Sequence, residues 1–304
     1  MGRNKYGGRR YARSASKYTV YNVNEVTTLM EFLMKKMDGI SRGKVKSMLT
    51  HGTILVDDEI ITQYDHPLRP GMKVMQTRYK ITHKFHHPMM RLVYEDAYMF
   101  VVDKAEGLLS ANVVGSRERS AQNVLGDYLK AMNRRDSRVR VVHRLDRCTS
   151  GLMIFAKDDK TQHTFRDNWV EIVPDRRYVA VVEGDVKDDA GSVTSYLTDH
   201  REIVTSSLED DGGRIAITHY KVLKRMKGLS LLELKLDTGR KHQIRVQMAS
   251  IGHPVMGDRK YGAEKDILGR VALHGRTIKF FHPVTGKLME YETPIPEPFM
   301  SLFK

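Results

Sequence analysis

The sequence has almost none of the features that would place the protein outside the cell or in a membrane. Cys148 is the single cysteine among 304 residues, so no disulfide can form within the chain, and we expect a reducing, cytoplasmic location. The N-terminus lacks the charged and then apolar pattern of a signal peptide, and no stretch approaches the ~20 apolar residues of a membrane span. We therefore expect no membrane partner.

Acidic residues are scarce relative to basic ones. Lys and Arg total 51 and Asp and Glu total 37, which gives a net charge of +14, and the pI is about 9.7. Such a chain is expected to bind a polyanion, with nucleic acid favoured over a membrane surface, although charge does not distinguish RNA from DNA. The 40% of apolar residues are enough for the core of a globular enzyme.

Motifs for metals and cofactors are also missing. The polar segment 81–90 contains His83, His86 and His87, but no Cys or carboxylate cluster accompanies them at metal-ligand spacing, so we interpret it as a linker and predict no metal. No Gly-rich loop of the kind that holds a nucleotide cofactor is present, and we predict no cofactor.

The features that are present begin with a basic N-terminal segment. Residues 1–18 carry six basic residues and no acid among Gly, Ser and Tyr, which is too little apolar surface for a core. We interpret them as an arm that binds phosphates, with a merely solubilising tail as the alternative.

Residues 19–80 have the pattern of a small separate domain. Apolar residues at helical spacing predict a helix over 29–37, and turn residues at 57–59 and 70–71 predict a hairpin and a last strand near Val74. Ser41 can cap a second helix that turns its apolar side chains inward and keeps three basic residues in solvent, namely Arg42, Lys44 and Lys46.

The remainder, residues 91–304, predicts a larger α+β domain. Many short apolar segments alternate with turns and only a few stretches have helical spacing, which favours a mixed, mostly antiparallel sheet with peripheral helices. Residues 185–213 are a polar excursion with little recognisable pattern.

The most informative segment is 143–151, with the sequence His-Arg-Leu-Asp-Arg-Cys-Thr-Ser-Gly. It sets one short carboxylate among arginines, between two apolar segments that predict strands. Catalytic groups often lie in such connections, so Asp146 is a candidate catalytic residue. The local pattern alone would equally suit a turn in which Asp146 pairs with Arg144 or Arg147.

Arginines are concentrated on either side of Asp146. Six of them lie between residues 134 and 147 and predict a positive wall suited to phosphates: Arg134, Arg135, Arg138, Arg140, Arg144 and Arg147. A solvated charge run is the alternative for Arg134, Arg135 and Arg138.

Two later segments carry further candidates. Residues 176–184 alternate as a strand, from which alone Tyr178 would be a core aromatic residue. Residues 236–245 follow a predicted strand and open a helix. In that helix Ile244, Met248 and Ile251 form an apolar face, and Arg245 projects away from it.

Taken in order, these blocks resemble the RluA-type RNA pseudouridine synthases, from about residue 20 to the C-terminus. The resemblance rests on His-Arg-Leu-Asp with Thr-Ser-Gly, the strand around Tyr178, the segment 236–245 and the closing Phe-His-Pro-Val-Thr-Gly at 281–286. Residues 19–80 resemble the S4 RNA-binding domain. Ala105 replaces a family proline without removing a chemical group, and Gln247 stands where the family often has His.

The resemblance implies an isomerase that converts uridine in RNA to pseudouridine without a cofactor. Its catalytic residues would be Asp146, Tyr178 and Arg245, with Arg245 holding Asp146 ionised through paired hydrogen bonds and Tyr178 stacking on uracil or moving a proton. Arg144 would fill the gap that the uridine leaves in the RNA stack. Further RNA contacts would come from His143, Leu145, Thr149, Gln243, Leu273, Arg42, Lys44 and Lys46.

The implied substrate is large-subunit ribosomal RNA, with transfer RNA second, acted on by a monomer. Two other interpretations remain open at this point: a non-catalytic RNA-binding or ribosome-assembly protein, and an N-glycoside hydrolase that releases the base. A nucleophile centred on Cys148 is the weakest hypothesis, because this thiol occupies what looks like a variable position beside Asp146.

Overall fold

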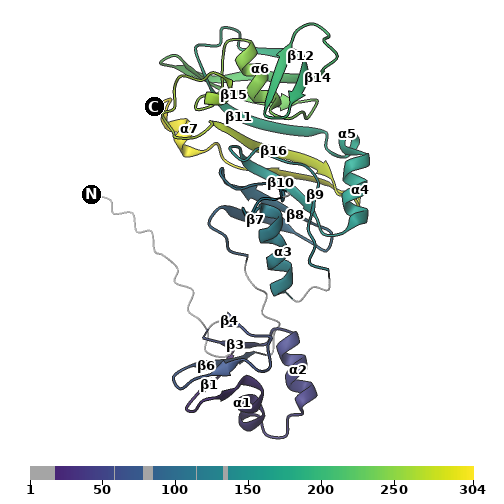
Figure 1. Ribbon diagram of the computed structural model, residues 1–304, viewed down its shortest axis with the longest axis vertical. Coiled ribbons are helices and arrows are strands. Elements are labelled where there is room, and N and C mark those ends of the chain that lie inside the picture. The colour runs from purple at the N-terminus through teal and green to yellow at the C-terminus, as the bar shows by residue number, and fades with distance from the viewer. Residues whose placement is uncertain (1–17, 58, 78–84, 114, 133–135) are drawn as a thin grey trace, which may run out of the picture. The chain divides into compact units, whose positions relative to one another are not determined.

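The computed structural model describes residues 18–57, 59–77, 85–113, 115–132 and 136–304 (Figure 1). The chain divides after residue 84 into a smaller N-terminal unit and a larger unit of residues 85–129 and 136–304. The predicted basic arm except Tyr18, the first part of the predicted linker, and Arg134 and Arg135 lie outside the described residues. No helix in the described part is long and apolar enough to cross a membrane.

The smaller unit contains the two helices that its sequence predicts. Helix α1 (Leu29–Lys36) begins at Thr28, whose hydroxyl accepts a hydrogen bond from the Glu31 amide, and α2 (Arg42–Thr50) begins at Ser41. Their apolar faces pack with a sheet in the order β1–β6–β3–β4. The strands are β1 (Tyr18–Asn22), β6 (Lys73–Thr77), β3 (Ile54–Val56) and β4 (Glu59–Ile60), and β2 (Thr27–Thr28) pairs separately with β5 (Pro67–Leu68).

The larger unit is built on one 11-stranded sheet (Figure 1). Its order is β13–β12–β14–β15–β11–β16–β10–β8–β7, with β17 on β16 and β9 on β10. Only β10 and β16 pair in parallel, which confirms the predicted mixed, mostly antiparallel sheet of an α+β fold. The strands are β7 (Met90–Glu95), β8 (Met99–Lys104), β9 (Arg140–Val141), β10 (Ser150–Ala156), β11 (Asp175–Glu183), β12 (Ala190–His200), β13 (Ile203–Ser207), β14 (Arg214–Met226), β15 (Leu229–Leu236), β16 (Leu273–Phe281) and β17 (Leu288–Glu292).

Helices cover both faces of this sheet. Because side chains alternate along a strand, Phe100 of β8 packs with Leu125 of α3 (Ala121–Ala131), whereas Met99 and Val101 pack with Phe165 of α4 (Asp159–Asp167) on the opposite face. The short α5 (Trp169–Ile172) lies on the same side as α4. Helices α6 (Gln243–Ser250) and α7 (Glu297–Ser301) complete another apolar cluster over β11 and β15.

The polar excursion at 185–213 contains two strands that its sequence did not reveal. β12 pairs with β14 from Ala190↔Lys221 to Leu197↔Arg214, and β13 forms the outer edge. Val193 and Leu197 are buried, but the alternate position between them is Ser195, which is also buried. A polar side chain at an inward position interrupts the apolar alternation by which a strand is predicted.

The glycine of Thr-Ser-Gly is required by a close approach of two strands. Gly151 has φ = +124°, and a Cβ atom there would lie 2.2 Å from the Gly275 carbonyl oxygen. This contact is the parallel junction of β10 and β16, just after the segment that carries Asp146. Any larger residue would move the junction and the preceding segment with it.

Candidate active site

Asp146 lies in the connection between β9 and β10, as predicted, and the backbone on both sides of it is held in place. The Ser110 hydroxyl donates to the Leu145 carbonyl at 2.6 Å and accepts from the Leu145 amide at 3.2 Å. The Gly107 amide donates to the Arg147 carbonyl at 2.7 Å, and the Thr149 amide donates back to the Asp146 carbonyl. The carboxylate is therefore presented from a fixed segment while remaining partly accessible.

Arg245 on α6 reaches Asp146, but the geometry differs from the predicted pair of hydrogen bonds. One nitrogen, Nη1, donates to Asp146 Oδ2 at 3.0 Å. Nε and Nη2 donate instead to the two oxygens of Asp258, at 2.6 and 2.9 Å, and Asp258 is only 1% exposed. Burial opposes the charge of Arg245, yet these carboxylates raise its pKa above the ordinary value. Arg245 is thus anchored by Asp258 and offers one donor to Asp146.

His242 is a neighbour of Asp146 that the sequence did not single out. Its backbone has φ = +54°, in the left-handed region, immediately before α6. Nε2 lies 3.8 Å from Asp146 Oδ1, beyond hydrogen-bond distance, and Nδ1 lies 2.7 Å from the Tyr261 hydroxyl. Burial lowers the pKa of His242, and Asp146 acts in the opposite direction. Within the described residues, Asp146 Oδ1 is left without a hydrogen bond.

Asp146 lines a pocket that brings together most of the predicted site residues. The predicted residues that line it are Arg144, Leu145, Asp146, Thr149, Tyr178, Gln243, Arg245 and Leu273. Four lining residues were not predicted, namely Leu236, Arg240, His242 and Ile244. Arg240 and His242 stand beside Gln243 in the same sequence block, which is the signal that could have identified them.

Tyr178 enters the pocket from β11, directly after a register shift between Arg177 and Tyr178. Burial raises the pKa of Tyr178. The charge of Arg176 acts to lower this pKa, and the charge of Asp146 acts to raise it. Its ring lies along Gly275, where an added Cβ atom would be 3.4 Å from Tyr178 Cε1. Since no described residue hydrogen-bonds the Tyr178 hydroxyl, this group is available to a ligand.

Two other predicted residues of the pocket differ in how much of their hydrogen-bonding capacity is used. The Thr149 hydroxyl is buried and has no partner among the described residues. Gln243 is fully engaged: its oxygen accepts from the Arg240 amide and the Thr238 hydroxyl, and its nitrogen donates to the Ile217 carbonyl. Gln243 therefore shapes the loop before α6, whereas the Thr149 hydroxyl keeps unused hydrogen-bonding capacity.

His143 lies outside the pocket, which corrects its prediction as an RNA contact. Its Nε2 accepts a hydrogen bond from the Ile154 amide at 3.0 Å, and its ring centroid is 5.1 Å from that of Trp169. Burial, aided by the charge of Arg176, lowers the pKa of His143 to about 3, so the ring stays neutral. The residue supports the fold beneath the Asp146 segment.

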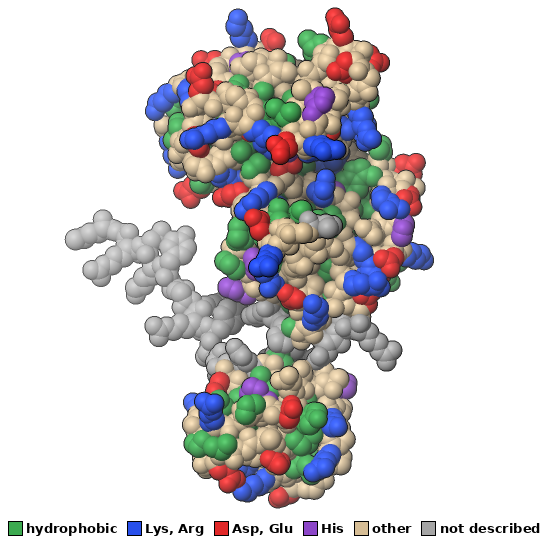
Figure 2. Space-filling view, viewed as in Figure 1, with side chains coloured by type: hydrophobic (Ala, Val, Ile, Leu, Met, Phe, Trp, Pro, Cys, Tyr) green, Lys and Arg blue, Asp and Glu red, His purple; other side chains and the backbone are tan. Residues whose placement is uncertain are grey.

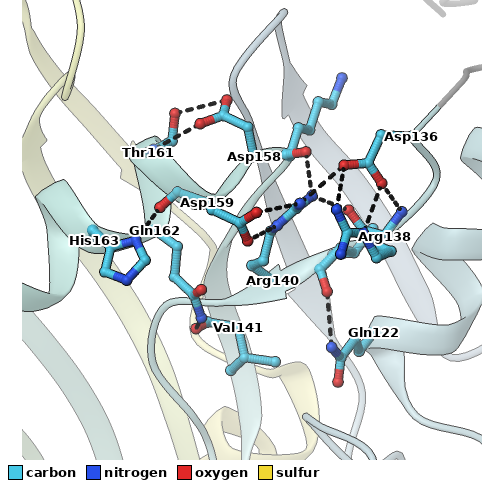
Figure 3. A network of polar contacts seen from close by, with 12 residues as sticks. Gln122, Asp136, Arg138, Arg140, Val141, Asp158, Asp159, Thr161, Gln162 and His163 are labelled. Atoms are coloured by element: carbon cyan, nitrogen blue, oxygen red, sulfur yellow. Dashed lines mark hydrogen bonds and ion pairs between the residues drawn. The ribbon is translucent and has the colours of Figure 1, made fainter.

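The predicted wall of arginines around Asp146 is also corrected, because Arg140 is an internal residue. Figure 3 shows its guanidinium between Asp136 and Asp159. Its Nη1 donates to two backbone carbonyls, those of Arg138 and Lys157. Of the described arginines in this run, Arg138, Arg140 and Arg147 have carboxylate partners and Arg144 has none.

Helix α6 is buried on more sides than the predicted apolar face. Gln247 is enclosed, accepting from the Thr218 hydroxyl at 2.6 Å and donating to the Ser195 hydroxyl and the Ala216 carbonyl. At the position where the resemblance led us to expect His, the chain thus has an amide that ties α6 to the sheet. Ile251, expected on the apolar face, is 37% exposed and follows the last helical residue.

The three basic candidates of the smaller unit, Arg42, Lys44 and Lys46, lie exposed on α2. Lys44 lines a groove with Ser47, Met48, His51, Thr53, Gln76 and Thr77, and the Lys46 ammonium lies 5.0 Å from the centre of the Tyr64 ring. Figure 2 shows that Lys and Arg side chains are mixed with Asp and Glu on the visible face of each unit.

Comparison with known proteins agrees with the fold. The family model of RNA pseudouridylate synthases matches residues 98–250. An uncharacterized RNA pseudouridine synthase of Bacillus subtilis, YhcT, is 36% identical over 214 residues, which cover 69% of this chain and 70% of the relative. The chain belongs to the RNA pseudouridine synthase family.

Longer and more distant matches point the same way. The ribosomal large subunit pseudouridine synthase D of Pseudomonas aeruginosa is 30% identical over 278 residues, 86% of each chain. The solved structure of human RNA pseudouridylate synthase domain containing 1 matches with a TM-score of 0.55 at 23% identity, covering 68% of this chain and 84% of that one. The synthase is accordingly an RNA isomerase with the pseudouridine synthase fold. In its described part, no three His, Cys, Asp or Glu residues gather as metal ligands would.

Proposed function

We propose that the synthase isomerises specific uridines of large-subunit ribosomal RNA, with Asp146 as the catalytic residue. The observation that carries this proposal is the Asp146 carboxylate at the pocket, whose Oδ2 accepts from Arg245 while no described residue donates a hydrogen bond to Oδ1. The choice of RNA is supported by the Pseudomonas aeruginosa relative, whose name assigns it to the large ribosomal subunit. Transfer RNA is the second candidate substrate.

The reaction breaks the bond between ribose C1′ and uracil N1, turns the base and joins C1′ to C5. The C5 proton is then lost and N1 takes up a proton. No electron is gained or lost overall. An ionised carboxylate at the pocket can attack the sugar or the base, or remove the C2′ proton. Arg245 holds this carboxylate in position, because its hydrogen bond fixes one of the two oxygens.

Tyr178 and Arg144 would receive the uridine once it has left the RNA stack. The Tyr178 ring lines the pocket and its hydroxyl has no partner among the described residues, which suits stacking on uracil or proton transfer. Arg144, which has no carboxylate partner in the described part, is available to fill the gap in the RNA. Removing a base from its stack costs a few kcal/mol, which contacts elsewhere must offset.

The smaller unit would supply part of these contacts as an S4-like RNA-binding domain. Arg42, Lys44 and Lys46 on α2 are the residues that we assign to it. A cytoplasmic location and a monomeric state remain predictions of the sequence.

Tritium release from RNA labelled with 5-³H-uridine tests the function directly. We expect the synthase to release tritium from ribosomal RNA without free uracil, and Asp146→Asn to release none. Release from transfer RNA alone would reassign the substrate. Free uracil among the products would indicate a hydrolase, and tight RNA binding without release would indicate a binding protein.

A further inference from the structure

The arginines of the larger unit differ in whether they have an acidic partner. Most of those near the sheet are paired, as Arg177 is with Asp175 and Glu233. Among the described residues, no carboxylate pairs with Arg144, Arg176 or Arg240. Arg144 and Arg240 line the Asp146 pocket, whereas Arg176 has not yet been given a role.

Arg176 lies between the two segments that carry the pocket arginines. Its Cζ is 5.3 Å from the centre of the Trp169 ring, which in turn contacts His143, the residue before Arg144. On another side it meets Gly239, the residue before Arg240, where an added Cβ atom would be 2.9 Å from Arg176 Nη1. Arg176 also precedes Tyr178 by two residues on β11. It therefore lies beside the segments that line the pocket, although it does not line the pocket itself.

The surroundings of Arg176 leave its positive charge uncompensated. The side chain is partly buried, and its charge acts on both Tyr178 and His143. The indole ring offers a cation–π contact. No hydrogen bond of its guanidinium to a described residue accompanies that contact. A partly buried guanidinium without an anion is unfavourable compared with a paired one, so an anionic ligand would complete the site.

The chemistry of that ligand follows from the parts of the guanidinium that remain free. Since Trp169 lies along the group, stacking on a base is disfavoured, but the N–H edges can still donate in the plane. Two parallel N–H donors match two oxygens of a phosphodiester. We propose that Arg176, seated on Trp169, binds a backbone phosphate of the RNA strand next to the target uridine.

This inference rests on the proposed function, since it assumes that the uridine enters the Asp146 pocket from an RNA strand. Arg144, Arg176 and Arg240 would then lie around the entering nucleotide, and each could contact a different part of the RNA strand. A phosphate held at Arg176 would orient the strand without distinguishing its sequence. Arg176 is accordingly a binding residue, and its loss should weaken RNA binding more than it slows bound substrate.

The first test compares Arg176→Ala with Arg91→Ala. The control removes an exposed arginine of the edge strand β7 that is already paired with Asp103 of β8. Affinity for a large-subunit ribosomal RNA transcript would be measured across a range of salt concentrations. Loss of one phosphate contact should reduce the slope of log affinity against log salt by about 0.7–0.9. We expect this reduction, and a roughly fivefold weaker affinity at low salt, in Arg176→Ala and not in Arg91→Ala.

The second test uses Arg176→Lys and the fluorescence of Trp169, the single tryptophan of the chain. RNA binding should change this emission in the wild type and change it less in Arg176→Ala, while Arg176→Lys should restore most of the salt slope. In turnover assays of Arg176→Ala, KM for RNA should rise, while kcat should stay within about twofold of the wild-type value. Thermal unfolding of each variant would confirm that it is folded.

An unchanged salt slope and KM in folded Arg176→Ala would overturn the phosphate site. An equal loss in Arg176→Ala and Arg176→Lys, with a changed kcat, would assign the residue to support of the fold instead. These outcomes differ from a failure of the proposed function, in which the wild type itself makes no pseudouridine although the binding measurements still report on Arg176.

Discussion

Two buried arginines of the synthase, Arg140 and Arg245, each lie between two aspartates and yet differ in what they leave open. Arg140 uses its donors on Asp159, Asp136 and two backbone carbonyls, and its carboxylate partners face solvent, Asp159 with 62% of its side chain exposed. Arg245 binds the enclosed Asp258 with two nitrogens and donates one hydrogen bond to Asp146, a residue that lines the pocket and whose other oxygen has no donor among the described residues.

The difference shows how the same pairing serves two purposes. Around Arg140 every strong donor is satisfied within the protein, so the network joins β9 to the start of α4 (Figure 3). Around Arg245 the charge is fixed by one carboxylate so that a second carboxylate is held ready for a ligand. The ion pair of Arg245 and Asp146 is thus incomplete where the Arg140 network is not, and the following predictions test whether this difference matters for catalysis.

The largest effect is expected at Asp146. Asp146→Asn should lower the rate of pseudouridine formation by at least ~10³-fold, because the amide cannot act as a carboxylate nucleophile or base. Melting temperature and RNA affinity should stay near the wild-type values. The matched control is Asp136→Asn in the Arg140 network, and a similar loss of activity there would contradict the contrast.

Asp258→Asn should have the next largest effect, since Asp258 acts only through Arg245. We expect kcat to fall ~100-fold because Arg245 and hence Asp146 lose their position, with KM for RNA within about twofold. Asp258→Glu should recover part of kcat. A loss confined to KM would mean that Asp258 contributes to RNA binding instead of positioning Arg245.

Arg140→Ala should reverse this pattern by affecting stability and not catalysis. Arg140 is 8% exposed, and its removal should lower the free energy of unfolding by about 3 kcal/mol, the low end for a buried pair because both carboxylates reach solvent. Denaturant unfolding measures this change. Activity per folded molecule should be unaltered, and a tenfold lower kcat at full folding would show that the network extends to the pocket.

The smallest effect concerns His274, which holds the β10–β16 junction without any charge. Its Nδ1 lies 2.8 Å from the Ser150 hydroxyl and its Nε2 2.7 Å from the Thr293 hydroxyl, and burial lowers the pKa of His274 to about 4. Between pH 6.5 and 4 His274 binds a proton in the unfolded chain but not in the folded one. The free energy of unfolding therefore falls as the pH drops from 6.5 to 4.

This loss should be about 2.5 kcal/mol from His274 alone, because each unit of pKa difference corresponds to about 1.4 kcal/mol. Unfolding curves at several pH values would compare the wild type with His274→Gln, in which the decline between pH 6.5 and 4 should be shallower. Equal slopes in the two proteins would show that His274 takes up no differential proton. The buried arginines remain charged throughout this range.

The sequence predicted the parts of the molecule that depend on neighbours along the chain. Ser41 marks the start of α2, and the block at 236–245 marks the turn into α6. Short apolar runs mark β8 and β10, and an alternating pattern marks β11. The resemblance to the family then predicted that Asp146, Tyr178 and Arg245 share one site, and all three line one pocket in the structure. Their catalytic roles stay predictions until the Asp146 and Asp258 variants are measured.

What the sequence alone determined is which residue types stand in each local pattern. The tertiary structure decided which charges meet. The guanidinium of Arg245 binds Asp258, that of Arg140 binds Asp159, and the His143 ring packs on Trp169. Nothing in the local spacing of these residues distinguishes them from solvated ones. The physical reason is that an ion pair or a buried polar position depends on which strands become neighbours in the sheet, and local propensity carries no information about that pairing.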